Sequence, residues 1–194
     1  MSREKQNLNS DRPGRLFYVM GPSGAGKDTL MAYARESLCE APVIFAHRYI
    51  TRPVELHGEN HIHLSEAEFA NRLQRGCFKF HWNSHGWSYG LGTEVDTWLN
   101  QGLNVVMNGS RGYFEQACQL HADLVAVLVT ASESTLRERL LARGRESAAE
   151  IEERIGRASN FERLAAANLH RITNEASIEA GGEALINIFS EQEG

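Results

Sequence analysis

The sequence has little cysteine, no long hydrophobic run and no excess of positive charge. Its three cysteines, Cys39, Cys77 and Cys118, are an odd number, lie far apart and lack metal-ligand spacing. They therefore predict reduced thiols rather than a disulfide framework. No apolar run approaches the ~20 residues of a membrane-spanning helix, and a net charge of −5 gives no broad basic field for nucleic acid. We expect a cytoplasmic protein that acts on small molecules and binds neither nucleic acid nor membrane.

The size and the hydrophobic pattern favour one α/β domain. The chain has 194 residues, of which 42% are apolar, enough for a full core. We expect a single domain over residues 1–194, with residues 1–14 as a disordered leader. Short apolar runs alternate with helical patterns, which is typical of a mostly parallel sheet covered by helices on both faces. The five candidate strands are Leu16–Met20, Val43–Ala46, Leu103–Met107, Leu124–Val129 and His170–Thr173.

Several helix ends carry capping residues. Ser65 and Ser147 are each followed three positions later by a glutamate, which is the capping-box pattern. Ser132 and Thr93 are predicted to cap two further helices, and Gly144 is predicted to end the helix that Ser132 begins.

The most specific chemical pattern is Gly21–Asp28, which directly follows the apolar run Leu16–Met20. It matches the phosphate-loop pattern G-x-x-x-x-G-K, in which backbone N–H groups and a helix N-terminus cradle phosphates and the lysine adds a point charge. The alternative is a tight glycine turn without a ligand. The predicted ATP-binding residues are Gly21, Pro22, Ser23, Gly24, Ala25, Gly26, Lys27, Asp28 and Thr29.

Asp28 stands where this pattern normally has the Ser or Thr that ligates magnesium. We expect Mg²⁺ as the cofactor that accompanies ATP, with Asp28 supplying negative charge to it directly or through water. The alternative is that Asp28 only stabilises the N-terminus of its helix.

Residues 137–157 are rich in arginine. Arg139 and Arg143 are four positions apart and share one helix face, and Arg154 follows on the next predicted helix. Two short helices joined at Gly144 predict a lid that brings these guanidinium groups over the phosphates. The three arginines, with Lys27, are the candidate catalytic residues. The alternative is a solvated helix face whose arginines pair with Glu138, Glu152 and Glu153.

The segment 48–92 interrupts the alternation of strands and helices and is rich in histidine, aromatic residues and glycine. In an open α/β sheet, insertions at the carboxyl ends of strands hold a second substrate. We therefore expect this segment to be an acceptor-binding insertion, the alternative being a surface subdomain without a role.

The blocks Gly21–Lys27 and Arg139–Gly144, together with Arg154, resemble the guanylate kinase family of P-loop kinases. The resemblance covers most of the chain from Arg15 onward. It implies a three-layer fold with a five-stranded core sheet, the acceptor insertion and a helical lid. With the sugar-phosphate branch described below, it also implies acceptor-binding roles for Arg48, Thr51, Arg52, His61, Tyr89, Asn108 and Arg111.

The departures from that family are informative. Guanylate kinases read guanine with a Glu and with a Ser or Thr that follows Tyr-Gly, but Phe80 (or the neighbouring His81) and Leu91 occupy these positions here. A site without polar readers cannot offset the desolvation of the guanine edge, so we expect an acceptor that has phosphate but no base. The blocks Tyr49–Pro53 and Asn108–Arg111 resemble the branch of this group that phosphorylates ribose 1,5-bisphosphate in phosphonate breakdown.

The resemblance to this branch implies transfer of the ATP γ-phosphoryl group to ribose 1,5-bisphosphate, which gives 5-phosphoribosyl 1-diphosphate and ADP. One alternative is a guanylate kinase or another nucleoside monophosphate kinase. Another is a non-catalytic binding module of the same fold, which the intact loop Gly21–Lys27 disfavours. The expected partners are ATP and a sugar bisphosphate, and a homodimer is compatible with this interpretation.

Overall fold

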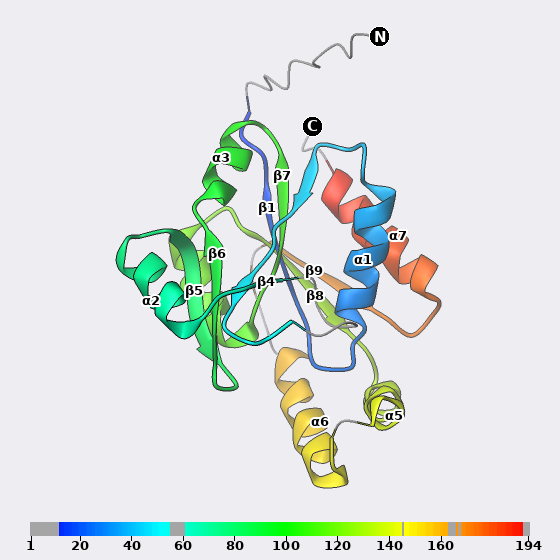
Figure 1. The fold of residues 1–194 in the computed structure, drawn as a ribbon. Helices are drawn as coiled ribbons and strands as arrows, with labels where there is room; N and C mark the ends of the chain where they lie inside the picture. Colours follow the sequence, from blue (N-terminus) through cyan, green and yellow to red (C-terminus); the bar gives the residue numbers. More distant parts are fainter. Residues whose placement is uncertain (1–11, 55–60, 145, 163–165, 167, 192–194) are drawn as a thin grey trace, which may run out of the picture. The chain divides into compact units, whose positions relative to one another are not determined.

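The computed structural model describes residues 12–54, 61–144, 146–162, 166 and 168–191. The chain divides into two compact units, one formed by Met1–Leu16 and Pro42–Val105 and the other by Phe17–Ala41 and Val106–Gly194 (Figure 1). The expected leader lies outside the described residues as far as residue 11. Within its remainder, the amide of Gly14 donates to the carbonyl oxygen of Leu99 over 2.7 Å.

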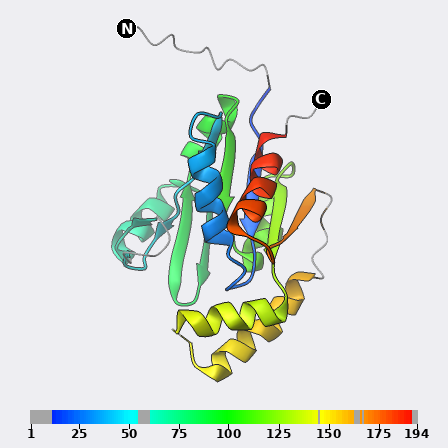
Figure 2. The ribbon, with the colours of Figure 1, turned by 90° about the vertical axis from the view of Figure 1, so that its right-hand side faces the viewer.

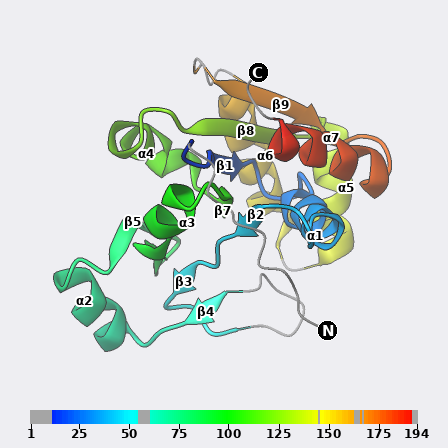
Figure 3. The ribbon, with the colours of Figure 1, turned by 90° about the horizontal axis from the view of Figure 1, so that it is seen from above.

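A five-stranded sheet has the strand order β2-β7-β1-β8-β9, and it confirms the expected core sheet. β1 pairs parallel with β8, and β8 pairs parallel with β9 (Figure 3). Every residue of β1 is buried, which explains why the strand is an uninterrupted apolar run. The strands are β1 (Leu16–Met20), β2 (Val43–Phe45), β7 (Asn104–Asn108), β8 (Val125–Thr130) and β9 (Leu169–Thr173).

Helices α1 (Lys27–Ser37) and α7 (Ile178–Ser190) lie side by side in the unit that carries the glycine-rich loop (Figures 1 and 2). A Cβ atom on Gly182 would lie 2.1 Å from the ring of Tyr33, so glycine is required for this close approach. The Tyr33 hydroxyl donates to Glu183 over 3.0 Å. The same unit contains η1 (Arg111–Tyr113), α4 (Phe114–Leu120), α5 (Glu133–Arg143) and α6 (Ala148–Glu162).

The helix ends follow the capping predictions with one exception. The hydroxyl of Ser132 accepts from the amide of Thr135 at the start of α5, and Gly144 ends α5 with a φ of 63°. Ser147 and Glu150 form a complete capping box, because each side chain accepts from the backbone N–H of the other. The predicted cap at Thr93 is wrong. Its backbone is already helical, with φ −68° and ψ −12°, and a capping side chain needs an extended backbone.

The other unit contains a four-stranded sheet of order β4-β3-β6-β5. β5 and β6 form an antiparallel hairpin closed by His85 and Gly86, with φ values of 50° and 78°, as two-residue hairpin turns require. Phe69 stacks on Phe78 in the small core beneath. The elements are β3 (Tyr49–Ile50), β4 (Ile62–His63), α2 (Glu66–Gln74), β5 (Phe78–Ser84), β6 (Trp87–Gly92) and α3 (Glu94–Asn100). Among the described residues of the chain, no helix is long and apolar enough to cross a membrane.

Candidate active site

The glycine-rich loop joins the end of β1 to the start of α1, as the sequence predicts. A Cβ atom on Gly21 would lie 2.2 Å from the carbonyl oxygen of Val129, so only glycine fits there. Gly24 and Gly26 have φ values of 89° and 80°, a left-handed conformation that other residues rarely adopt. The loop therefore has the backbone geometry of a phosphate cradle at a helix N-terminus.

Lys27, Asp28 and Asn108 form a closed set of hydrogen bonds at the mouth of this loop. Lys27 Nζ donates to Asp28 Oδ1 over 2.7 Å and to Asn108 Oδ1 over 2.6 Å. Asn108 Nδ2 donates to the same Asp28 oxygen over 2.9 Å. Asn108 is buried at the end of β7, so this strand fixes the lysine ammonium beside the loop.

The carboxylate and amide oxygens at the mouth of the loop are of the type that binds magnesium. The described residues contain no group of three or more His, Cys, Asp or Glu side chains that would hold a metal ion by itself. Magnesium commonly binds to one or two carboxylates, with phosphate and water as the other ligands. The Asp28 side chain is 66% exposed and lies in the first turn of α1. Its carboxylate thus suits both the metal role and the interaction with the helix dipole.

Two of the three candidate lid arginines contact the glycine-rich loop. Arg139 in α5 donates to the carbonyl oxygens of Gly24 and Asn174 over 3.4 Å and 3.1 Å. Arg154 in α6 donates to Ser23 Oγ over 3.0 Å. The third, Arg143, lies 3.8 Å from Glu146.

Two other arginines fit the alternative interpretation of this segment, a solvated helix face whose arginines pair with glutamates. Arg137 makes two hydrogen bonds to Glu152, of 2.9 Å and 3.0 Å, and Arg157 pairs with Glu153. Helices α5 and α6 therefore carry two kinds of arginine: those that contact the glycine-rich loop and those that form ion pairs at the surface.

Sequence reasoning missed Asn174, which follows β9 and braces the loop. Its Nδ2 donates to the carbonyl oxygen of Ala25 over 2.8 Å in a buried hydrogen bond, and its amide donates to Thr130 over 2.7 Å. A Cβ atom on Gly26 would lie 2.5 Å from the same Nδ2. The available signal was its place at the carboxyl end of a parallel strand, where the loops of such sheets gather.

The next residue, Glu175, holds the start of α5. Its carboxylate accepts from the hydroxyl of Thr135 over 2.6 Å and from the amide of Ser132. These hydrogen bonds, that of Thr135 first, lower the pKa of Glu175 below its ordinary value. The turn after β9 therefore binds both the glycine-rich loop and the N-terminus of α5.

Tyr18 holds the turn that follows β7. Its hydroxyl donates to the carbonyl oxygen of Ser110 over 2.7 Å and accepts from the amide of Ser110 over 2.8 Å. A Cβ atom on Gly109 would lie 2.1 Å from the Tyr18 ring. This contact fixes the direction of the chain between Asn108 and the exposed Arg111.

Five of the seven predicted acceptor-binding residues lie in the unit that contains the hairpin. The Arg48 guanidinium lies 5.1 Å from the centre of the Tyr89 ring, which stacks on Trp82. The buried Thr51 accepts from the amide of Ser88 over 3.0 Å. The sixth and seventh, Asn108 and Arg111, belong to the other unit.

His61 and Arg52 are joined locally. His61 is buried, and its Nε2 lies 2.9 Å from the carbonyl oxygen of Arg52. Since Thr51 and Tyr89 also lie on the paired strands β3 and β6 or next to them, the structure brings Arg48, Thr51, Arg52, His61 and Tyr89 to one region of this unit. Their roles in acceptor binding stay predictions.

Phe80 and Leu91, at the positions expected to have lost the guanine readers, face each other in the register of β5 and β6. Both side chains are fully buried. These positions therefore form part of the hydrocarbon core of the hairpin.

Comparisons with known proteins agree with this architecture. A family model described as an AAA domain matches residues 18–158. The crystal structure of guanylate kinase from Anaplasma phagocytophilum has a TM-score of 0.70 at 17% identity, covering 92% of this chain and 85% of that one. A ribose 1,5-bisphosphate phosphokinase PhnN from Psychromonas ingrahamii is 55% identical over 92% of this chain and 91% of its own. Its counterpart from Thiobacillus denitrificans is 52% identical over 92% and 94%.

The fold and the glycine-rich loop define an α/β P-loop protein with a guanylate-kinase-like fold. The two phosphokinase relatives are similar to this chain over nearly its whole length, and they define its family more narrowly. The chain belongs to the family of the ribose 1,5-bisphosphate phosphokinases PhnN. The homodimer and the lack of nucleic-acid partners stay predictions.

Proposed function

We propose that this protein transfers the γ-phosphoryl group of ATP to ribose 1,5-bisphosphate, giving 5-phosphoribosyl 1-diphosphate and ADP. The acceptor follows from its relatives, which are 52–55% identical and carry that name. The observation that carries the kinase chemistry is that Arg139 and Arg154 both donate to the glycine-rich loop that ends at Lys27. Phosphoryl transfer asks a protein mainly for such positioning and charge neutralisation.

The reaction needs no general base. An oxygen of the acceptor's 1-phosphate is already ionised and attacks the γ-phosphorus, while the bond from that phosphorus to the β–γ bridging oxygen breaks and ADP leaves. No proton has to be removed from the nucleophile. This agrees with a site in which Lys27, Asn108 and the lid arginines supply cations and amides, and in which the Asp28 carboxylate is already hydrogen-bonded to Lys27 and Asn108.

We assign the charge-neutralising roles to four residues. The ammonium of Lys27 lies at the helix end of the loop and suits the outer phosphates. Arg139, Arg143 and Arg154 project from α5 and α6 and suit the oxygens of the group in transfer. When Mg²⁺ is bound, it neutralises charge on the β- and γ-phosphates, and Asp28 is the residue that would hold it.

We assign acceptor binding to the hairpin unit. Arg48 and Arg52 supply cations for the acceptor phosphates, and Thr51, His61 and Tyr89 shape the surrounding backbone. Phe80 and Leu91 present no polar atom to a purine, which supports a sugar phosphate over a nucleotide. Two exposed free thiols, Cys39 and Cys77, support a reducing compartment such as the cytoplasm.

An acceptor screen with labelled ATP tests this function. Ribose 1,5-bisphosphate, ribose 5-phosphate and GMP are compared with wild type and with Lys27→Met as the inactive control. We expect turnover with the bisphosphate alone. GMP as the best acceptor would show a nucleoside monophosphate kinase, and no turnover with any acceptor would favour a binding module.

A further inference from the structure

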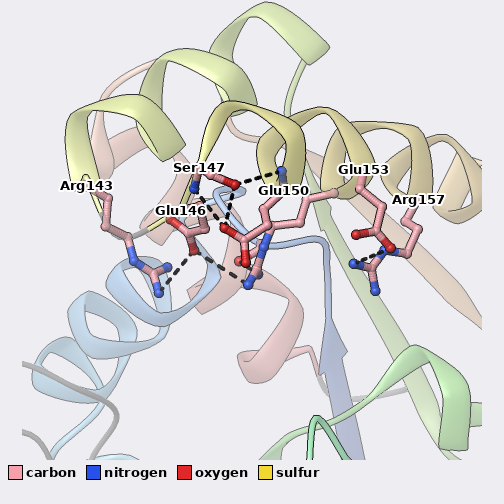
Figure 4. Close-up of polar contacts among 8 residues, drawn as sticks. Arg143, Glu146, Ser147, Glu150, Glu153 and Arg157 are labelled. Carbon is pink, nitrogen blue, oxygen red and sulfur yellow. Dashed lines mark hydrogen bonds and ion pairs between the residues drawn. The ribbon is translucent and has the colours of Figure 1, made fainter.

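The side chain of Glu146 lies between two of the lid arginines and is almost completely buried. Its Oε1 is 3.8 Å from Arg143 and 3.6 Å from Arg154 (Figure 4). The side chain is only 5% exposed. Its other oxygen, Oε2, is buried and has no hydrogen-bond partner in the described part of the chain.

The other carboxylates of this region are paired more closely. Glu153 lies 3.2 Å from Arg157, and Glu150 accepts from the amide and the hydroxyl of Ser147, both over 2.8 Å (Figure 4). A charge-assisted hydrogen bond normally measures about 2.7–2.9 Å. Glu146 is thus buried, where a charge is costly, without the close pairing that offsets such a cost.

The two arginines beside Glu146 differ in their surroundings. Arg154 also donates to Ser23 of the glycine-rich loop over 3.0 Å, so one guanidinium contacts both the loop and Glu146. Arg143 has a side chain that is 44% exposed. Without a counter-charge, two guanidinium groups this close repel each other, and the more exposed one turns to solvent.

We propose that Glu146 is a positioning residue that holds Arg143 and Arg154 side by side, facing the glycine-rich loop, until phosphates bind there. The inference rests on the proposed function, since it assumes that these arginines act on the transferred group. The ion pairs are long, so the arginines move onto phosphate oxygens with little competition from Glu146. The carboxylate therefore contributes to the arrangement of the arginines in the transition state more than to ATP affinity.

The test compares Glu146→Gln, Glu146→Asp and the control Glu153→Gln in steady-state kinetics and thermal unfolding. Glu146→Gln keeps the size of the side chain and removes its charge. We expect kcat to fall about tenfold, as for a small misplacement of catalytic groups, with KM for ATP within about threefold of wild type. The melting temperature should not fall, because an unsatisfied buried charge is removed. Glu153→Gln should leave kcat unchanged.

Glu146→Asp keeps the charge on a shorter side chain, and its kcat should lie between those of wild type and Glu146→Gln. If Glu146→Gln does not fold, Glu146→Asp decides, and a wild-type kcat overturns the inference. A kcat of Glu146→Gln within twofold of wild type also overturns it, as does a fall matched by Glu153→Gln. Failure of the proposed function is distinct, because wild type itself would then not turn over ribose 1,5-bisphosphate.

Discussion

Lys27 Nζ donates to Asn108 Oδ1 over 2.6 Å and so connects the start of α1 to the end of β7. The resemblance to known kinases places Asn108 in the acceptor site, whereas its contacts place it beside the phosphate-loop lysine. The two roles differ in their kinetics. A positioning role affects the transition state, and an acceptor-binding role affects the acceptor KM.

We therefore predict that Asn108→Ala lowers kcat roughly tenfold while the acceptor KM changes little, since Lys27 loses the group that aims it. Initial-rate kinetics with ribose 1,5-bisphosphate as the varied substrate measure both constants. Asn104→Ala is the matched control, because Asn104 lies on the same strand and accepts from the amide of Arg15 instead. A large rise in acceptor KM at constant kcat contradicts the positioning role.

Asp28→Ser tests the metal assignment. If Asp28 holds magnesium directly or through water, the Mg²⁺ concentration for half-maximal activity should rise roughly tenfold, in line with the loss of a ligand or of its partner. Activity is measured against Mg²⁺ at fixed ATP, with the surface variant Asp96→Ser as the control. An unchanged magnesium dependence would mean that Asp28 does not hold the metal and only stabilises the N-terminus of its helix.

The strands could be predicted because their apolar runs are local and continuous. β1 has the predicted bounds, Leu16–Met20. β7 was expected to end at Met107 but extends to Asn108. Hydropathy did not indicate this last residue, because a buried asparagine becomes favourable only when Lys27 and Asp28 satisfy its amide.

The site was predictable only as far as it is local in sequence. The glycine-rich loop is one continuous segment, so its spacing indicates its chemistry. Asn174 acts on Ala25 from 149 positions away, and no pattern of spacing reports such a contact. Glu146 looks like a surface residue of a charged segment, and only the fold shows that it is buried between arginines.

Asn174→Ala should destabilise the protein by about 1–3 kcal/mol, because the carbonyl of Ala25 loses its short, buried hydrogen bond and keeps only the longer one from Arg139, of 3.5 Å. The loop should also lose its fixed shape, so KM for ATP should rise. Urea unfolding and ATP kinetics measure the two effects. Asn100→Ala, at the exposed end of α3, is the control. Equal stabilities of the two variants would contradict the bracing role.

Phe80→Glu introduces at position 80 the residue type that guanylate kinases use to bind guanine. The Phe80 side chain is fully buried opposite Leu91, so an unpaired carboxylate there should cost about 3–5 kcal/mol of folding free energy. We expect loss of stability in urea unfolding and no gain of activity with GMP. Phe80→Leu, which preserves the hydrocarbon core, is the control. A stable Phe80→Glu protein that phosphorylates GMP would place this position in the acceptor site.

The hydrogen bonds of Thr135 and Ser132 to Glu175 predict a pH-dependent stability of the lid helix α5. They hold the pKa of Glu175 below its ordinary value of 4.5, so the folded state favours the ionised form. The resulting stabilisation is present above the ordinary pKa and is lost as the pH falls through the lowered pKa of the folded state.

Glu175→Gln should therefore melt at a lower temperature than wild type at neutral pH, and the difference should shrink as the solution is acidified below the ordinary pKa of a glutamate, 4.5. Thermal unfolding across this pH range measures it. Glu133→Gln, in the first turn of the same helix, leaves the contacts of Ser132 and Thr135 with Glu175 in place and serves as the control. A difference between wild type and Glu175→Gln that stays constant with pH would mean that Glu175 holds α5 through its shape and not its charge. In that case the turn after β9 connects loop and lid by hydrogen-bond geometry alone.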